Sequence, residues 1–180
     1  RVAEAADHLD CTHVLNVQGD EILVLPDDLK MYVKAIEQNP QGLVWNAVGP
    51  IEAEKELDDP SIVKCIVSKS NQLLYASRSF STFKKSKSYH PVRIVLGLLA
   101  YQKDFLSKLK TLPRTPAEIH ERIDQNRILE NDIPIIGVPF KKGYPGINEP
   151  KEVDVINQYL KNDAGQKIIL KKISKNIVAC

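Results

Sequence analysis

Short β-branched apolar segments alternate with amphipathic helical segments along most of the chain, and this alternation restricts the folds open to it. The expected strands are residues 12–17, 42–51, 92–102 and 133–140. Val and Ile are enriched there in runs of strand length. Residues 26–39 carry apolar side chains at helical spacing behind a proline, as in a helix that begins at that proline. Alternating strands and helices predict an α/β fold whose mostly parallel sheet is covered on both faces.

Two strands inserted midway interrupt this alternation. Residues 62–68 and 73–79 read as a hairpin around the turn residues 69–71, which carry Ser and Asn. Residues 115–131 read as one helix with Thr115 as its N-cap. The pattern assigns residues 1–163 to one domain and leaves the lysine-rich segment 164–180 either as an edge strand or as a disordered end.

Composition narrows the possible functions. A net charge of +2 without a basic block does not favour nucleic-acid binding. No apolar run reaches the length of a membrane span, so we expect no membrane partner. The three cysteines are scattered and lack metal-ligand spacing, which is typical of a reducing, cytoplasmic protein. The chain opens on Arg1 within a helical pattern that has no N-cap, and we therefore expect a truncated amino terminus.

Two polar turns follow expected strands. Gln18, Gly19, Asp20 and Glu21 come directly after the first strand, and a Gly-rich loop with Asn148 follows the last one. Ligands collect at the carboxyl ends of parallel strands. A carboxylate and an amide oxygen are ligands that suit Mg²⁺. The same residues also fit an acidic turn before a helix and an Asn N-cap before Pro150, and spacing alone leaves both interpretations open.

Several segments, in order, resemble one enzyme family. Residues 15–22, LNVQGDEI, are similar to VNVQGDEP of the 3-deoxy-manno-octulosonate cytidylyltransferases and identical to it over residues 16–21. Residues 96–106, LGLLAYQKDFL, are similar to LGIYGYRAGFI, and residues 146–156, GINEPKEVDVI, to GVDTPEDLERV. The segments LLYASRS and IDQNRILEN match further family motifs, so the resemblance spans about residues 1–160.

This resemblance implies a Rossmann-like sheet of the nucleotide-diphospho-sugar transferase type with an inserted antiparallel dimerisation element, and hence a homodimer. It implies Mg²⁺-dependent transfer of CMP from CTP to a 3-deoxy-ulosonic or related sugar acid, with release of pyrophosphate. Asp20 would act as the catalytic metal ligand together with Asn148. The expected substrate-binding residues are Gln18, Arg78, Asp124 and Gln125. Arg78 either contacts the substrate or braces the site, or it forms a salt bridge near the dimer contact, since arginine is common in these roles.

Four departures from the family pattern leave a second interpretation open. Asn148 replaces a metal-binding aspartate, Val95 and Leu99 replace a histidine and a tyrosine near the sugar, and Asp124 replaces a glutamate. The family's Gly- and Arg-bearing loop that grips the triphosphate does not occur in these residues. Loss of polar pocket groups changes specificity strongly. The alternative is a non-catalytic binding or assembly module with a decayed sugar pocket.

Overall fold

The computed structural model describes residues 1–86, 88–147, 150 and 152–177. The strands are β1 (His13–Val17), β2 (Val44–Pro50), β3 (Lys64–Val67), β4 (Leu73–Ser77), β5 (Val92–Gln102) and β6 (Ile135–Pro139). The α-helices are α1 (Val2–Asp7), α2 (Pro26–Glu37), α3 (Lys103–Leu109), α4 (Pro116–Glu121), α5 (Asp124–Leu129), α6 (Glu152–Asn162) and α7 (Ala164–Ile177). Two 3₁₀ turns, η1 (Glu54–Leu57) and η2 (Ser81–Phe83), lie between strands.

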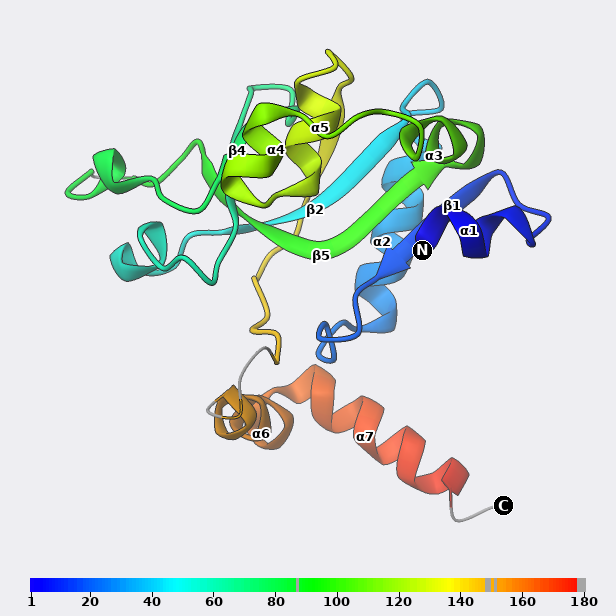
Figure 1. Ribbon diagram of the computed structural model, residues 1–180. Coiled ribbons are helices and arrows are strands. Elements are labelled where there is room, and N and C mark those ends of the chain that lie inside the picture. The colour runs from blue at the N-terminus through cyan, green and yellow to red at the C-terminus, as the bar shows by residue number, and fades with distance from the viewer. Residues whose placement is uncertain (87, 148–149, 151, 178–180) are drawn as a thin grey trace.

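The sheet is mixed, with β5 at its centre (Figure 1). β1, β2 and β3 all pair with β5 antiparallel, and β3 and β4 form the predicted hairpin. β1, β2 and β6 share one direction, but among the ladders of the described residues only β2 and β6 pair in parallel. The α/β class is confirmed, whereas the expected mostly parallel sheet is a mixed one. The hydrophobic pattern of a strand does not encode its direction.

β5 has a central stretch that no strand covers on one edge. β1 pairs with residues 98–102 of β5, and β3 pairs with residues 92–94 on the same edge. Between them, the backbone groups of β5 bond to the turns that flank β1 and β3. Val95 N–H donates to the Val63 carbonyl at 2.8 Å, and the Gly97 carbonyl accepts from Gln18 N–H at 2.9 Å. This interruption opens a space at the carboxyl end of β1.

Helices cover both faces of the sheet (Figure 1). One apolar cluster joins α1, α3 and α5 to the sheet through Ala6, Phe105 and Ile128. The other joins α2 to the opposite face through Tyr32, which packs with Trp45. β2 is buried along nearly its whole length, as expected of a strand covered on both faces. These two helical layers therefore cover β2 and β5, the strand that carries the open stretch, on opposite faces.

Two local expectations are corrected. The helix expected over residues 115–131 breaks into α4 and α5, because Arg122 adopts a left-handed conformation (φ 57°, ψ 47°) and Ile123 is extended and 2% exposed. Residues 164–177 form the helix α7, neither an edge strand nor a disordered segment. Its first turn is anchored to the loop after β1, since Gln166 donates to the Leu23 carbonyl at 2.5 Å. Residues 178–180 lie outside the described residues.

None of the helices in the described part of the chain combines the length and the apolar character that a membrane crossing requires.

Candidate functional site

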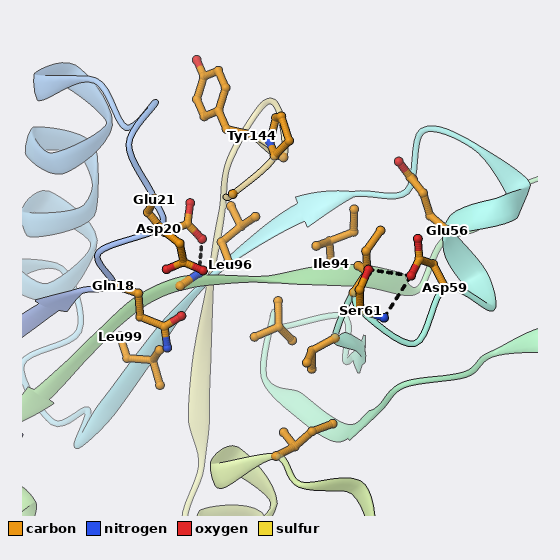
Figure 2. Close-up of a pocket in the computed structure, with 18 of the residues that line it drawn as sticks. Gln18, Asp20, Glu21, Glu56, Asp59, Ser61, Ile94, Leu96, Leu99 and Tyr144 are labelled. Atoms are coloured by element: carbon orange, nitrogen blue, oxygen red, sulfur yellow. Dashed lines mark hydrogen bonds between the residues drawn. The ribbon is translucent and has the colours of Figure 1, made fainter. Parts of the chain in front are cut away.

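An open cavity of about 820 Å³ lies over the uncovered stretch of β5. Ile94, Leu96 and Leu99 of β5 contribute apolar walls. Figure 2 shows Gln18, Asp20 and Glu21 at one end of this stretch and Glu56, Asp59 and Ser61 at the other. The volume falls within the range of small-molecule sites, which typically combine apolar walls with a few polar groups.

The turn after β1 is tied to β5 through Glu21. The Glu21 carboxylate accepts the Gly97 N–H at 2.5 Å, and so takes the place of a carbonyl from a neighbouring strand (Figure 2). A Cβ at Gly97 would lie 2.6 Å from Gln18 Oε1 and 2.8 Å from Glu21 Oε1. Glycine is therefore required at position 97 for both side chains to lie where they do. Sequence analysis identified the motif but not this partner.

Burial raises the pKa of the Glu21 carboxyl above its ordinary value of 4.5, and the charge of Asp20 adds to the increase, while the hydrogen bond from Gly97 opposes it. The raised pKa means that the folded protein retains the proton to a higher pH than the unfolded chain does. Ionised Glu21 thus costs folding free energy, and this cost develops as the pH rises from about 4.5 through the folded-state pKa.

We expect Glu21→Gln to be more stable than the wild type at neutral pH, because glutamine keeps an acceptor for the Gly97 N–H but carries no buried charge. The difference in the free energy of unfolding should shrink as the pH falls toward 4.5. Urea denaturation from pH 4 to pH 8 measures it, with the exposed residue Glu37 changed to Gln as control. A difference that stays constant over this range would contradict the role given to burial.

The loop after β6 closes against Asp20. Ile147 N–H donates to the Asp20 carbonyl at 3.4 Å, and a Cβ at Gly146 would lie 3.4 Å from Asp20 Oδ2. Gly143 crosses the end of β2 so closely that a Cβ on Gly49 would lie 3.1 Å from its Cα. The two turns that the sequence placed at strand ends therefore meet. Asn148 lies outside the described residues, so its predicted metal role stays a prediction.

The chemistry of this corner fits a magnesium ion. Among the described residues no group of three His, Cys, Asp or Glu side chains forms a preassembled metal site. Mg²⁺ does not require one, because it is usually held by one or two carboxylates together with substrate phosphates and water. Asp20 is half-buried at the cavity wall and supplies one such carboxylate. Glu21 is already engaged by Gly97 and is the weaker candidate.

A bulge in β2 orients Gln125. The register between β2 and β5 shifts between Asn46 and Val48, and the buried Asn46 amide donates to the Leu96 carbonyl at 2.9 Å. Asn46 Oδ1 accepts from Gln125 Nε2 at 2.8 Å. Gln125 and its exposed neighbour Asp124 both line the cavity at the start of α5. Sequence analysis missed Asn46, which resembles an ordinary strand residue; its polarity inside an apolar run was the available signal.

Arg78 braces the cavity wall. Its Nε donates to the Glu121 carbonyl at 3.0 Å, its Nη1 to the Pro60 carbonyl at 2.6 Å, and its Nη2 to the Arg122 carbonyl at 3.4 Å. These bonds join β4 to the turn between α4 and α5 and to the loop before β3. Arg78 also lines the cavity. The bracing role is thus visible in the structure, and the substrate-binding role stays a prediction.

Lys64, which sequence analysis also missed, supports the same wall from inside. Its side chain is fully buried, and Nζ donates to the carbonyls of Asp59 at 2.8 Å, Ile62 at 2.8 Å and Arg78 at 2.5 Å. Burial lowers the pKa of the Lys64 ammonium, and the carboxylates of Asp59 and Asp58 oppose that shift. A buried ammonium with three acceptors fixes the loop that carries the cavity residue Ser61.

Negative charge dominates the cavity lining. Its carboxylates are Asp20, Glu21, Glu52, Glu56, Asp59, Asp124 and Glu152, and its cations among the described residues are Lys55, Arg78 and Arg122. Such a surface attracts divalent cations and disfavours an anionic ligand that arrives without one. This single cavity brings together all the described residues that sequence analysis predicted for the site, namely Gln18, Asp20, Arg78, Asp124 and Gln125.

Comparisons with known proteins agree with this geometry. A family model described as cytidylyltransferase matches residues 1–135. The 3-deoxy-manno-octulosonate cytidylyltransferase of Chlorobium limicola is 32% identical over 171 residues, which cover 92% of this chain and 68% of that protein. The enzyme of the same name from Protochlamydia amoebophila is 30% identical over 155 residues, with 84% of this chain and 60% of that protein covered. The chain thus spans roughly two thirds of the length of these relatives.

A solved structure shows the same fold. It is a CMP:2-keto-3-deoxy-manno-octonic acid synthetase complexed with CTP, which superposes with a TM-score of 0.80 at 24% identity. The match covers 89% of this chain and 66% of that protein.

Proposed function

Because this chain belongs to the cytidylyltransferase family, we propose that the protein transfers CMP from CTP to a 3-deoxy-manno-octulosonate-type sugar acid and releases pyrophosphate. The observation that carries the proposal is the meeting of the turn 18–21 with the loop 143–147 in one cavity. The turn lies within residues 15–22 and the loop runs into residues 146–156, two of the segments that resemble motifs of the 3-deoxy-manno-octulosonate cytidylyltransferases. The sequence identity of 30–32% to 3-deoxy-manno-octulosonate cytidylyltransferases supports CTP and a sugar acid of this type as the two substrates.

The reaction needs a sugar hydroxyl and a nucleotide α-phosphate held in line. The anomeric oxygen forms a bond to the α-phosphorus, the bond from that phosphorus to the β-phosphate oxygen breaks, and the hydroxyl proton is lost. Such transfer depends mainly on positioning and on neutralising the phosphate charge. Magnesium, held by Asp20 and by Asn148, would supply that neutralisation. Glu21 and Gly97 fix the turn that carries Asp20.

The cavity wall at the start of α5 would receive the sugar acid. Gln125, oriented by Asn46, and Asp124 offer polar groups for sugar hydroxyls. Val95 and Leu99 also line the cavity and offer apolar surface where the family motif has polar side chains. A pocket that lacks a polar partner discriminates against a substrate group that needs one. The preferred sugar acid would therefore differ from 3-deoxy-manno-octulosonate in a substituent that faces Val95 and Leu99.

We also propose a cytoplasmic homodimer. β4, the second strand of the hairpin, forms one edge of the sheet. Its residues Leu74 and Tyr75 are 59% and 42% exposed. An exposed apolar edge of this kind is typical of an interface. Cys11 and Cys65 are free thiols, which suits a reducing compartment. Light scattering of the protein in solution measures the mass of the assembly.

Pyrophosphate release by the full-length protein tests the catalytic proposal. With CTP, Mg²⁺ and a panel of 3-deoxy sugar acids, we expect release with at least one acid and its loss when EDTA removes the metal.

The apolar character of Val95 and Leu99 favours the second candidate, a non-catalytic binding module. No release across the panel, together with no rise in melting temperature on adding CTP, would contradict the catalytic proposal and favour that second candidate.

A further inference from the structure

Arg122 occupies a backbone conformation that is costly for an arginine. It caps the carboxyl end of α4 at φ 57° and ψ 47°, a left-handed position where glycine or asparagine is usual. Non-glycine residues persist in such conformations only when the surroundings hold them there, and they cluster at functional sites. The position is well held, because Arg122 N–H donates to the Glu118 carbonyl at 2.8 Å and the Arg122 carbonyl accepts from Arg78.

The neighbouring Glu121 fixes the same turn from the side of β4. Its carboxylate accepts from Tyr75 Oη at 3.1 Å, from Ser77 Oγ at 3.1 Å and from Arg78 N–H at 3.1 Å. These three donors hold the Glu121 carboxylate on β4. Backbone bonds of Arg122 and side-chain bonds of Glu121 therefore place Arg122 at the cavity wall, and the Arg122 side chain takes no part in them.

The guanidinium of Arg122 is exposed and lines the cavity, and no side chain or carbonyl of the described residues holds it. Arg78, another cation of the lining, differs in this respect. Arg78 spends its donors on three backbone carbonyls. Lys55, the third cation, lies on η1 with Glu54 and Glu56 as its sequence neighbours, and not in the turn between α4 and α5. In a cavity with this excess of negative charge, an anionic group near the start of α5 finds an available partner at Arg122.

We propose that the Arg122 guanidinium binds the carboxylate of the sugar acid and makes Arg122 a specificity-determining residue. This inference rests on the proposed function. Arg122 lies two residues before Asp124 and three before Gln125, so a sugar ring that contacts those side chains presents its carboxylate to the same turn. A planar guanidinium matches a carboxylate with two parallel hydrogen bonds, which gives direction as well as charge.

The test compares Arg122→Gln and Arg122→Lys with the wild-type full-length protein, using the sugar acid and its neutral methyl ester. Arg122→Gln should raise KM for the acid about 10- to 100-fold, the range of one charge-assisted pair. KM for CTP and kcat should stay close to the wild-type values, because the lost contact is made equally in ground state and transition state. The preference for the acid over the ester should shrink in Arg122→Gln and be partly kept in Arg122→Lys.

Arg114→Gln is the matched control. It removes the same charge near the start of α4, outside the cavity, and Glu118 keeps Arg127 as its partner. Calorimetric binding of the sugar acid to each variant separates the two proposals. If the wild-type protein turns over but Arg122→Gln has an unchanged KM for the acid and an unchanged acid-to-ester preference, the role of Arg122 is overturned. The proposed function would stand in that case. Absence of both turnover and sugar-acid binding in the wild type would overturn the proposed function and this inference with it.

Discussion

Asp20→Ala is expected to lose at least about 1,000-fold in kcat/KM, because removing the carboxylate that holds the metal removes several kcal/mol of transition-state stabilisation. Asp20 is the carboxylate at the meeting point of the turn after β1 and the loop after β6. The measurement is pyrophosphate release with CTP and the accepted sugar acid over a range of Mg²⁺ concentrations. Asp20→Asn keeps one oxygen ligand without the charge, and its activity should recover partly at high Mg²⁺.

Asp27→Ala is the control for this experiment. Asp27 is an exposed carboxylate in the first turn of α2 that pairs with Lys30. It is close in sequence but does not line the cavity. Its activity should match the wild type. Turnover by Asp20→Ala at the wild-type rate and with the wild-type Mg²⁺ requirement would remove Asp20 from the site.

Gly97→Ala is expected to reduce kcat/KM on the order of 100-fold, the usual penalty for misplacing site groups by about 1 Å. The new Cβ would lie 2.6 Å from Gln18 Oε1 and 2.8 Å from Glu21 Oε1, so both side chains must move. These atoms are the free ends of side chains. The free energy of unfolding should therefore change by no more than about 1 kcal/mol. Turnover and urea denaturation, measured on the same preparation, separate the two effects.

Gly137→Ala provides the contrasting variant. A Cβ there would lie 2.7 Å from the Asn71 carbonyl, which is backbone and also accepts the Gly137 N–H at 2.6 Å. This variant should lose stability, because the hydrogen bond between β6 and the hairpin turn cannot stay in place. If Gly97→Ala instead lost stability while its remaining folded fraction kept full turnover, the proposed link between Gly97 and the site would be wrong.

Local sequence predicted most elements of the fold but not their directions or junctions. The hairpin around residues 69–71 was predicted because its turn chemistry is local. The antiparallel course of β5 was not, because both faces of a buried strand are apolar whichever way it runs. The break at Arg122 was missed for a related reason. Residues 115–131 have helical spacing throughout, and the burial of Ile123 that accompanies the break is a tertiary effect.

In the candidate site, too, residues of a contiguous motif were predicted, whereas residues whose roles depend on distant contacts were not. Gln18 and Asp20 were found because a motif of six residues is contiguous in the sequence. Asn46 and Lys64 were missed because their roles come from distant partners. Asn46 meets Gln125 across 79 positions of sequence, and Lys64 meets the Arg78 carbonyl across 14. A single polar residue inside a strand pattern gives no indication of which group it bonds.

A crystal of the full-length protein grown with CTP and Mn²⁺ gives the most direct test, since Mn²⁺ accepts the same oxygen ligands as Mg²⁺. We predict an anomalous scattering peak within about 2.5 Å of an Asp20 carboxylate oxygen, beside the loop 143–147 and in contact with the nucleotide phosphates. A peak coordinated only by other carboxylates of the cavity, or bound nucleotide without a peak near Asp20, would contradict the account.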